Sequence, residues 1–335
     1  MTVVAAVATL VACALLSLAS GAAGIPVAGV VLEMLDRLPF LSIDSGLSER
    51  QATILTQIRL PRVVLGGLVG SSLAMAGSAY QGVFRNPLAD PFLLGIAAGA
   101  GLGASVSLIF GLDWSIGPVG ALQLLAFVGA LIAVSLAMLI GRAAPNQTAS
   151  LLLAGIATAS FFTAVQTYLL SRNVDTQRSI ISWLFGTLVG ANWDRVMVLA
   201  FYLVLCGGVL VALRRQFDVL RVGEAEARTL GLRPDRVKLI ALVAASLLTA
   251  AAVSVSGLIS FVGLVVPHTI RLMIGSSYRM VVPLSGLAGA AFVILADWIS
   301  RSVASPAELG IGVVTAFVGA PFFAFLLVKT KAGSL

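Results

Sequence analysis

Charge is scarce in this chain, and its scarcity excludes most soluble architectures. Asp, Glu, Lys and Arg make up 10% of the 335 residues, whereas 59% are hydrophobic. An ordinary soluble domain carries about 25% charged residues. The mean hydropathy of +1.06 is typical of a polytopic membrane protein, and 34 glycines suit helices that pack closely in lipid. We therefore expect an all-α membrane protein.

Cysteine and histidine are almost absent, which leaves little for redox, metal or hydrolytic chemistry. The two cysteines, Cys13 and Cys206, lie in apolar runs and predict neither a disulfide framework nor a metal site. The single histidine, His268, has no plausible metal-ligating partners nearby, and no Ser–His–Asp set or pair of carboxylates stands out. We therefore expect that the chain is not an enzyme and binds no metal or cofactor itself.

The sequence also lacks a nucleotide-binding motif and nearly all midmembrane charge. No G-x-x-x-x-G-K-[ST] loop is present, so the chain is not expected to hydrolyse ATP. Ion-coupled carriers usually keep charged residues at midmembrane, where each costs ~2.5–3.5 kcal/mol. Here Asp297 and Arg301 lie four residues apart near a helix end, and we expect a solvated pair. These absences favour an apolar pathway moved by an external energy source; a secondary transporter working alone is the alternative.

Long apolar runs fill most of the chain. A membrane span needs roughly 20 apolar residues, a rule that predicts about ten spans. We place them at 3–24, 59–82, 92–111, 117–141, 148–170, 193–213, 237–256, 259–274, 281–300 and 309–328. The first is interpreted as a span and not a signal peptide, because no basic region precedes it. Residues 1–335 are expected to form a single transmembrane domain.

The distribution of basic residues predicts the orientation in the membrane. With both termini in the cytoplasm, most of the 21 Lys and Arg residues and every lysine fall on the cytoplasmic side, in agreement with the positive-inside rule. The same bias accounts for the basic pI of about 10.1. Nucleic acid is therefore not expected as a partner, and lipid is.

One polar segment, residues 214–238, interrupts the apolar pattern and is expected to lie in the cytoplasm. Within it, Val222–Leu230 predicts a short amphipathic helix whose first turn is acidic, as the helix dipole favours. Gly231 is expected to cap this helix, and Pro234 prevents its continuation. Such a helix suits contact with a soluble protein; a solvated connector is the alternative.

Ordered motifs over nearly the whole chain resemble a single family. The polar segment contains LRVGEAEARTLGL. The other motifs, in chain order, are RLPR (Arg59–Arg62), GxxYQxxFRNPLADPxxLG (Gly77–Gly95), LLLAGIA (Leu151–Ala157), SWLFGTL (Ser182–Leu188), GLISFVGLVVPHTIR (Gly257–Arg271), ADWISR (Ala296–Arg301) and ELGIGVVTAFVGAPFFAFLL (Glu308–Leu327). With these motifs the chain resembles the FecCD-type permeases, also called the cobalamin-permease-like family of ABC importers.

The resemblance implies a subunit with ten helices that works within a larger assembly in the bacterial cytoplasmic membrane. Two permease subunits, identical or sister chains, would lie above two ATP-binding subunits, which bind ATP and Mg²⁺. An extracytoplasmic binding protein would deliver the substrate. A ferric siderophore is the first expectation because it is the commonest substrate in the family; haem and cobalamin are the alternatives.

The resemblance also assigns residues to coupling and to docking. The helix that docks in a groove of the ATP-binding subunit would use Gly223, Glu224, Ala227, Leu230 and Gly231. Three arginines, Arg59, Arg62 and Arg301, match positions that receive acidic side chains of the binding protein. Guanidinium groups at the external ends of spans suit carboxylates independently of the family. Interfacial snorkelling, or pairing with Asp297 and Glu308, is the alternative for these arginines.

A cytoplasmic gate is implied at two places. Asn86, Pro87 and Leu88 match the turn that closes the pathway below, and a plain turn between helices is the alternative. Thr148 and Ala149 correspond to a second constriction.

A mildly polar stripe follows in the fifth span, where Gly155, Ala159, Thr163 and Gln166 recur every three or four residues. This spacing puts them on one side of a helix, either lining the pathway or packing against a neighbour. For His268 we expect a structural role, with ligation of a haem iron as the alternative, because the family pattern includes this histidine regardless of substrate.

Overall fold

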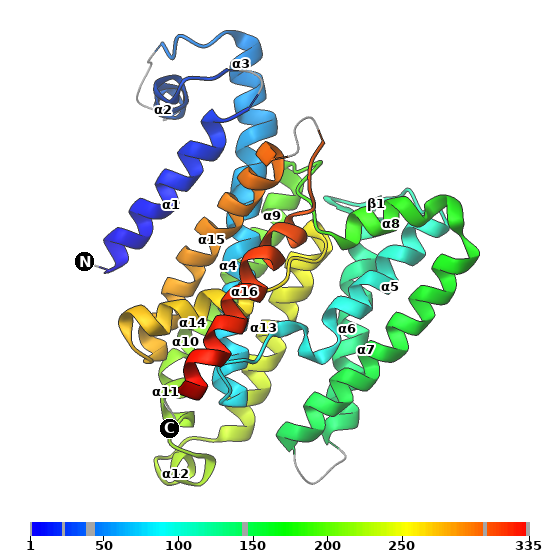
Figure 1. Cartoon of the computed structure of the whole chain (residues 1–335), viewed down its shortest axis with the longest axis vertical. Helices are drawn as coiled ribbons and strands as arrows, with labels where there is room; N and C mark the ends of the chain where they lie inside the picture. The colour runs from blue at the N-terminus through cyan, green and yellow to red at the C-terminus, as the bar shows by residue number, and fades with distance from the viewer. Residues whose placement is uncertain (1, 22–23, 38–43, 143–146, 304–306, 333–335) are drawn as a thin grey trace.

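The computed structural model describes residues 2–21, 24–37, 44–142, 147–303 and 307–332. Within these ranges the chain is almost entirely helical, and its helices run between the two ends of an elongated molecule (Figure 1). The strands described are β1 (Ser115–Ile116) and β2 (Val119–Gly120), an antiparallel hairpin with Ser115 opposite Gly120. The predicted all-α class is confirmed.

The helices, in chain order, are α1 (Thr2–Ala19), α2 (Val27–Asp36), α3 (Glu49–Thr53), the π-helix η1 (Ile54–Arg59), α4 (Leu60–Phe84), the 3₁₀ helix η2 (Pro91–Leu94), α5 (Ile96–Ile109), α6 (Ala121–Arg142), α7 (Gln147–Arg172), the 3₁₀ helix η3 (Val174–Thr176), α8 (Gln177–Leu184), α9 (Trp193–Tyr202), the π-helix η4 (Leu203–Gly207), α10 (Gly208–Ala212), α11 (Arg214–Leu220), α12 (Glu224–Thr229), α13 (Pro234–Ser256), α14 (Val262–Ile274), α15 (Tyr278–Val303) and α16 (Ile311–Ala332).

The long apolar helices lie where the hydropathy pattern predicts them. Six stretches are long and apolar enough to cross a membrane: Glu49–Phe84, Ala121–Gly141, Ala149–Arg172, Trp193–Ala212, Pro234–Ser256 and Tyr278–Val303. Four shorter apolar helices, Val3–Ala19, Ile96–Ile109, Val262–Ile274 and Ile311–Phe325, fall on the remaining predicted spans. A multi-pass membrane protein is confirmed, whereas the count of ten crossings stays a prediction because these four are short.

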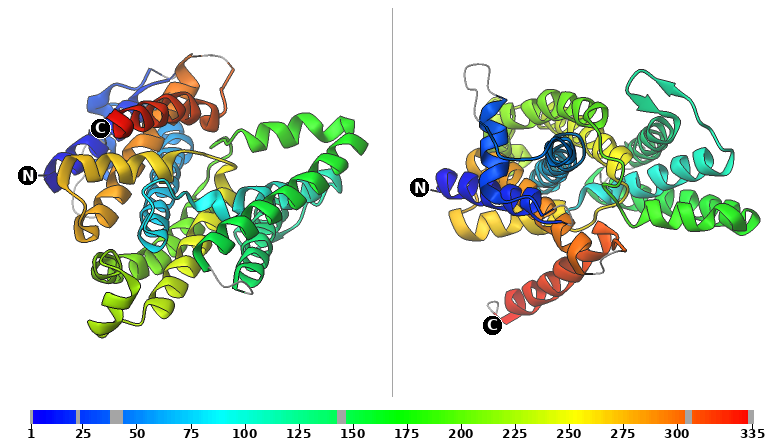
Figure 2. Two further views of the ribbon diagram at one scale, coloured as in Figure 1. Left: turned by 60° about the horizontal axis from the view of Figure 1, so that its bottom comes forward. Right: turned by 90° about the horizontal axis from the view of Figure 1, so that it is seen from above.

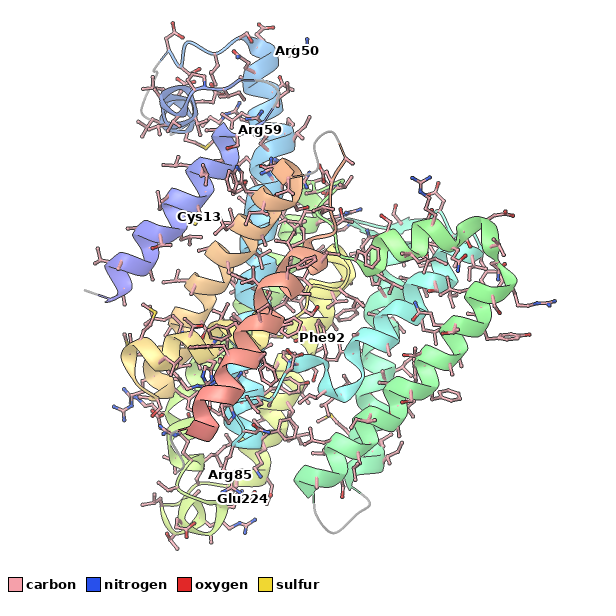
Figure 3. All side chains as sticks on the ribbon, in the orientation of Figure 1. Cys13, Arg50, Arg59, Arg85, Phe92 and Glu224 are labelled. Carbon is pink, nitrogen blue, oxygen red and sulfur yellow. The ribbon has the colours of Figure 1, made fainter. Side chains whose placement is uncertain are left out.

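The third predicted span is shortened by an irregular connection. α4 ends at Phe84, and residues 85–95 return toward the middle of the molecule, where Phe92 is labelled in Figure 3. Pro91 opens η2, and Gly95 at φ +82° separates it from α5. This connection brings Asp90 and Phe92 beside α7, and together they line a groove.

Helices α2, α8 and α11 were not predicted from the sequence, because none of them is a long apolar run. In α8 the two buried side chains, Ile180 and Trp183, are three residues apart on one face, which packs at the end of α5. Short amphipathic helices of this kind lie at the ends of the spans and not within them (Figure 1).

Helix α4 lies at the centre of the core, with α9, α13, α14 and α15 around it (Figure 2). Two glycines bring its backbone against its neighbours. A Cβ at Gly70 would lie 2.0 Å from the carbonyl oxygen of Gly289 in α15, and one at Gly77 would lie 1.9 Å from that of Gly263 in α14. Close approach through small residues is the usual way in which helices associate in lipid.

Helices α5, α6 and α7 pack together beside this core (Figure 1). Here too glycines face each other, since a Cβ at Gly99 of α5 would lie 2.3 Å from the carbonyl oxygen of Gly129 in α6. By contrast, α7 and α16 leave large apolar side chains uncovered, with Phe161 65% and Phe317 77% exposed. A membrane or another subunit has to cover these faces.

Candidate coupling, docking and pathway sites

The short helix α12 lies at one end of the molecule, opposite the end that carries Arg50 and Arg59 (Figure 3). It follows Gly223, whose φ of +131° is left-handed and favours glycine. A Cβ at this glycine would lie 2.0 Å from the Glu226 carboxylate. The helix therefore begins at Glu224, two residues later than predicted.

The predicted cap at the other end of α12 is present. Gly231 adopts φ +81°, and its N–H donates to the Arg228 carbonyl at 3.0 Å. The next N–H, of Leu232, reaches back to the Ala227 carbonyl at 3.0 Å. These two bonds form a Schellman motif, which satisfies carbonyls that the helix end would otherwise leave free.

Few contacts hold α12 to the rest of the chain. Glu224 pairs with Lys238 at the start of α13, and Arg228 pairs with Asp235 at 3.4 Å. Ala227 is fully buried, whereas Leu230 is 68% exposed. The helix thus exposes the apolar side chain of Leu230, and Gly223 and Gly231 fix its two ends.

At the opposite end, Arg62 lies between two carboxylates. Its Nη2 and Nε donate to Asp297 Oδ1 at 2.9 and 3.1 Å, and its Nη1 and Nη2 donate to the two oxygens of Glu308 at 2.9 and 2.7 Å. Arg301 donates from Nε to Asp297 Oδ2 at 3.1 Å. We call Arg62, Asp297, Arg301 and Glu308 the outer cluster.

The expectation of a solvated pair for Asp297 and Arg301 is wrong. The Asp297 side chain is 2% exposed and the Arg301 side chain 17%. The reason lies in α4, because Arg62 brings a second guanidinium to the carboxylate from a helix that is distant in sequence. With Glu308 the cluster holds two guanidinium groups and two carboxylates, so its charges and hydrogen bonds are matched at low exposure.

The third arginine, Arg59, is buried and contacts helix α1. Its Nη1 donates to the carbonyl oxygens of Leu18 at 2.6 Å and Ala19 at 3.2 Å, at the C-terminus of α1. Arg301 donates to Ser17 Oγ at 2.7 Å in the same turn. Two guanidinium groups therefore lie where the helix dipole favours positive charge. All three predicted docking arginines lie at one end, and each has partners within the chain.

The predicted gate residues Asn86, Pro87 and Leu88 form an exposed turn after α4. Asn86 Oδ1 accepts the Leu88 N–H at 2.9 Å, and its carbonyl accepts the Ala89 N–H at 3.1 Å. Arg85, just before them, is left-handed at φ +50°. The turn is thus stiffened by its own side chain and lies toward the end that carries α12 (Figure 3).

The second predicted constriction is only partly described. Ala149 is exposed in the first turn of α7, and the side chain of Thr148 lies outside the described residues. Both residues belong to the end of α7 that is nearer α12 (Figure 1).

The structure divides the stripe on α7 into two pairs. Gly155 and Gln166 are buried against neighbours: a Cβ at Gly155 would lie 2.1 Å from the Leu93 carbonyl oxygen, and Gln166 Nε2 donates to Ser105 Oγ at 3.0 Å. Ala159 and Thr163 line a groove of about 870 Å³. Two of the four residues thus pack against neighbouring elements, and the other two line a groove on an adjacent side of the helix.

Several residues of this groove were missed by sequence analysis. They are Asp90, Phe92, Leu93, Ile156, Ser160, Ala164 and Thr167. Ser160 and Thr167 lie three before and four after Thr163, so extending the helical periodicity would have found them. Asp90 and Phe92 come from the irregular connection before α5, and no local pattern places them here.

No metal centre is found in the part of the chain that the structure describes, where no group of three His, Cys, Asp or Glu side chains is placed to hold an ion. His268 lies on α14 with its ring 6.5 Å from that of Phe322 in α16. Both of its ring nitrogens are buried without a hydrogen-bond partner.

Comparison with known proteins agrees with the motifs. The FecCD transport family matches residues 9–329. The chain is 42% identical over 283 residues to the cobalamin import system permease protein BtuC of Halobacterium salinarum, covering 84% of this chain and 75% of that protein. It is 40% identical over 279 residues to the hemin transport system permease protein HmuU of Yersinia pestis, covering 82% and 83%.

A solved structure has the same fold. It is described as a metal-chelate type ABC transporter in an inward-facing conformation, and it superposes with a TM-score of 0.83 at 28% identity over 97% of this chain and 98% of that one. Nearly the whole chain is thus accounted for by one family in sequence and in fold. The chain belongs to the FecCD transport family.

Proposed function

We propose that this chain is the permease subunit of an ABC importer that carries a ferric siderophore across the bacterial cytoplasmic membrane. The observation that carries the proposal is the placement of two contact surfaces at opposite ends of a multi-pass chain. One end presents α12 with Leu230 exposed, and the other contains Arg59, Arg62 and Arg301, of which Arg62 is shared with the partly exposed Glu308. A permease that contacts ATP-binding subunits on one side of the membrane and a binding protein on the other needs such an arrangement.

Coupling to the ATP-binding subunits is assigned to α12. Gly223 and Gly231 fix its two ends, Glu224 and Ala227 attach it to the chain, and Leu230 is free to enter an apolar groove. ATP and Mg²⁺ would be bound by two separate ATP-binding subunits on this side, the cytoplasmic one. Both termini of the chain would lie in the cytoplasm as well.

Docking of the binding protein is assigned to Arg59, Arg62 and Arg301. Because Arg62 already holds Glu308 through two hydrogen bonds, an acidic side chain of the binding protein would compete with Glu308. The Glu308 side chain is 34% exposed, against 2% for Asp297, so it is the partner that exchanges more readily.

The pathway is assigned to the groove beside α7, where Ala159 and Thr163 lie with Asp90, Ser160 and Thr167. A carboxylate and three hydroxyl groups would be costly against lipid, at ~2.5–3.5 kcal/mol for an ionised acid at the bilayer centre. A second permease subunit facing α7 would enclose this groove and cover its apolar neighbours. Gly155 and Gln166 are left out because they pack inward.

The cytoplasmic gate is assigned to the turn Asn86–Leu88 together with Thr148 and Ala149. These residues lie on the side of α12, below the groove. Leu88 is 37% exposed in the single chain, so an apolar contact with the second permease subunit would bury it and close the pathway.

A metal chelate is the substrate class that we favour, because the similar solved structure is described as a transporter of the metal-chelate type. Haem and cobalamin are the alternatives, since relatives of comparable identity are named for hemin and cobalamin. A secondary transporter that works without ATP is the alternative of a different class.

Reconstitution separates these functions. The chain would be placed in liposomes with the ATP-binding subunits and binding protein encoded by its own organism, and uptake of a labelled ferric siderophore, haem or cobalamin would be measured. We expect uptake that requires ATP and the binding protein, with the siderophore preferred. Uptake by the isolated chain without ATP would contradict the proposal.

A further inference from the structure

Helix α11, just before the coupling helix, is bonded to a turn that is distant in sequence. The turn is 275–277, between α14 and α15. Asp218 accepts the backbone N–H of Tyr278 at 2.7 Å on Oδ1 and the hydroxyl of Ser277 at 2.8 Å on Oδ2. Arg221 donates to the carbonyl oxygen of Ser276 from Nη1 and to its Oγ from Nη2, both at 2.8 Å.

Each of these charges matches the end of the helix that it meets. Tyr278 is the first residue of α15, so its N–H is one of the donors that a helix leaves unsatisfied, and a carboxylate is favoured there. Ser276 follows the C-terminus of α14, where a guanidinium is favoured. Asp218 thus caps the start of α15, and Arg221, which directly follows α11, binds the turn that leaves α14. We call these four hydrogen bonds the α11 bracket.

Apolar packing holds α11 in the same place. Phe217 is fully buried, and its ring meets the ring of Tyr278 edge to face at a centroid distance of 5.7 Å. A Cβ at Gly82 of α4 would lie 3.3 Å from both rings, so the end of α4 packs on the same pair. α11 is therefore attached to α4, to α15 and to the turn 275–277.

Helices α11 and α12 are joined by a very short connection. Arg221 and Val222 alone separate Leu220, the last residue of α11, from Gly223 at the start of the α12 segment. α12 thus has two mechanical attachments. One is to α13, the next helix in sequence, through the ion pairs of Glu224 with Lys238 and of Arg228 with Asp235. The other is the α11 bracket, which leads to α15.

Helix α15 extends from the bracket to the outer cluster. Tyr278 begins it, Gly289 contacts α4 midway, and Asp297 lies near its far end with Arg62 and Arg301. Helix α4 also joins the two ends of the molecule, and its Gly82 packs against Phe217 of α11. Helix α15 is in addition hydrogen-bonded to Asp218 of α11. Energetic coupling between distant sites is carried by packed and bonded elements of this kind.

We propose that Asp218 and Arg221 are the positioning residues that transmit the movement of the coupling helix into α15, and through it to the docking end. The proposal rests on the function proposed above. It predicts that breaking the bracket separates ATP hydrolysis from transport while the ATP-binding subunits remain bound, because α12 itself is unchanged.

The test uses Asp218→Ala and Arg221→Gln, with Asp218→Asn as the conservative variant that keeps one acceptor oxygen. Arg215→Gln is the matched control, because Arg215 lies on the same helix, is exposed and makes no hydrogen bond or ion pair among the described residues. Each variant is measured in two ways: hydrogen exchange at the Tyr278 amide in the isolated protein, and substrate transported per ATP hydrolysed in liposomes with the partner subunits.

We expect faster exchange at Tyr278 in Asp218→Ala and a loss of transport per ATP on the order of 2- to 30-fold, the range found for residues that modulate coupling. Asp218→Asn should be intermediate, and Arg215→Gln should match the wild type. A normal transport ratio in Asp218→Ala, with the amide released, would overturn the inference. A wild-type protein that transports without ATP would overturn the proposed function instead, and the inference with it.

Discussion

The two ends of the molecule hold their charged residues in different ways. In the outer cluster, Arg62, Asp297 and Arg301 are almost enclosed and bonded to one another. At the α12 end, Arg228 and Asp235 are both more than half exposed and meet at 3.4 Å. Buried charges require matched partners, whereas exposed pairs contribute little. The outer end is therefore held by buried charge pairs, whereas the exposed pair at the α12 end contributes little to stability and leaves its charges accessible to a partner.

The largest effect is expected from removing the carboxylate at the centre of the outer cluster. Asp297→Ala leaves Arg62 and Arg301 without their shared partner, and breaking a buried pair in this way costs about 3–5 kcal/mol. Denaturant unfolding of the purified protein in detergent measures this loss. Asp113→Ala, at an exposed site, is the control and should change stability by less than about 0.5 kcal/mol. Equal stabilities of the two variants would contradict the conclusion that buried charge pairs stabilise the outer end.

At the α12 end, a substitution should affect binding and leave stability unchanged. Leu230→Asp puts a charge on the most exposed apolar side chain of the segment, and we expect about 2 kcal/mol or more of lost affinity for the ATP-binding subunit. Leu230→Met keeps the volume and should bind normally. Co-purification of the two subunits gives the measurement. Full uptake by Leu230→Asp would rule out α12 as the coupling helix.

Substitutions of the docking arginines should have different effects. Arg62→Glu is expected to lower the affinity for the binding protein roughly tenfold, about 1.4 kcal/mol, with partial recovery when an acid on that protein is changed to Arg. It should also destabilise the outer cluster, because Asp297 and Glu308 lose their shared guanidinium. Arg59→Gln should instead loosen α1, because Arg59 holds the carbonyls of Leu18 and Ala19. Titration calorimetry and thermal unfolding distinguish the two outcomes. If both variants bind normally, these arginines only stabilise the outer end.

The smallest effect is a pH dependence at Glu308. Its hydrogen bonds with Arg62 hold the pKa of Glu308 below the ordinary 4.5. A carboxyl with a lowered pKa stabilises the folded state above the unfolded pKa, and this contribution is lost as the pH falls through the folded value. Glu308→Gln should therefore be less stable than the wild type by about 0.2–1 kcal/mol near neutral pH. Thermal unfolding should show the difference shrink as the pH falls below the ordinary pKa of 4.5 and vanish once the pH is below the lowered folded pKa; a constant difference would contradict the assignment.

Features encoded by neighbouring residues were predictable from the sequence. The apolar runs predicted where the long helices lie, and Gly231 with Pro234 predicted the end of α12. The start of α12 was predicted two residues early, because the left-handed Gly223 interrupts the pattern. Local propensity and capping depend on a few adjacent positions, so these predictions needed no knowledge of the fold.

Contacts between distant residues were not predictable in the same way. Arg62 and Asp297 are 235 residues apart, and Asp218 and Ser277 are 59 apart. Periodicity placed Thr163 and Gln166 on one side of a helix, yet three neighbouring elements divide that side between a groove and a packed interface. Hydropathy reports which residues avoid water; it does not report which polar groups meet.

The glycine contacts along α4 limit which motions this protein can make. The backbones of Gly70 in α4 and Gly289 in α15 are in contact, and Gly77 of α4 contacts Gly263 of α14 in the same way. If α4 slid along α15 by a single residue, side-chain atoms would enter a space that has no room for a Cβ. Translation along this seam is thus blocked, whereas the helices it joins remain free to tilt or rotate as one body. A change of shape that keeps these contacts therefore has to move α4, α14 and α15 together.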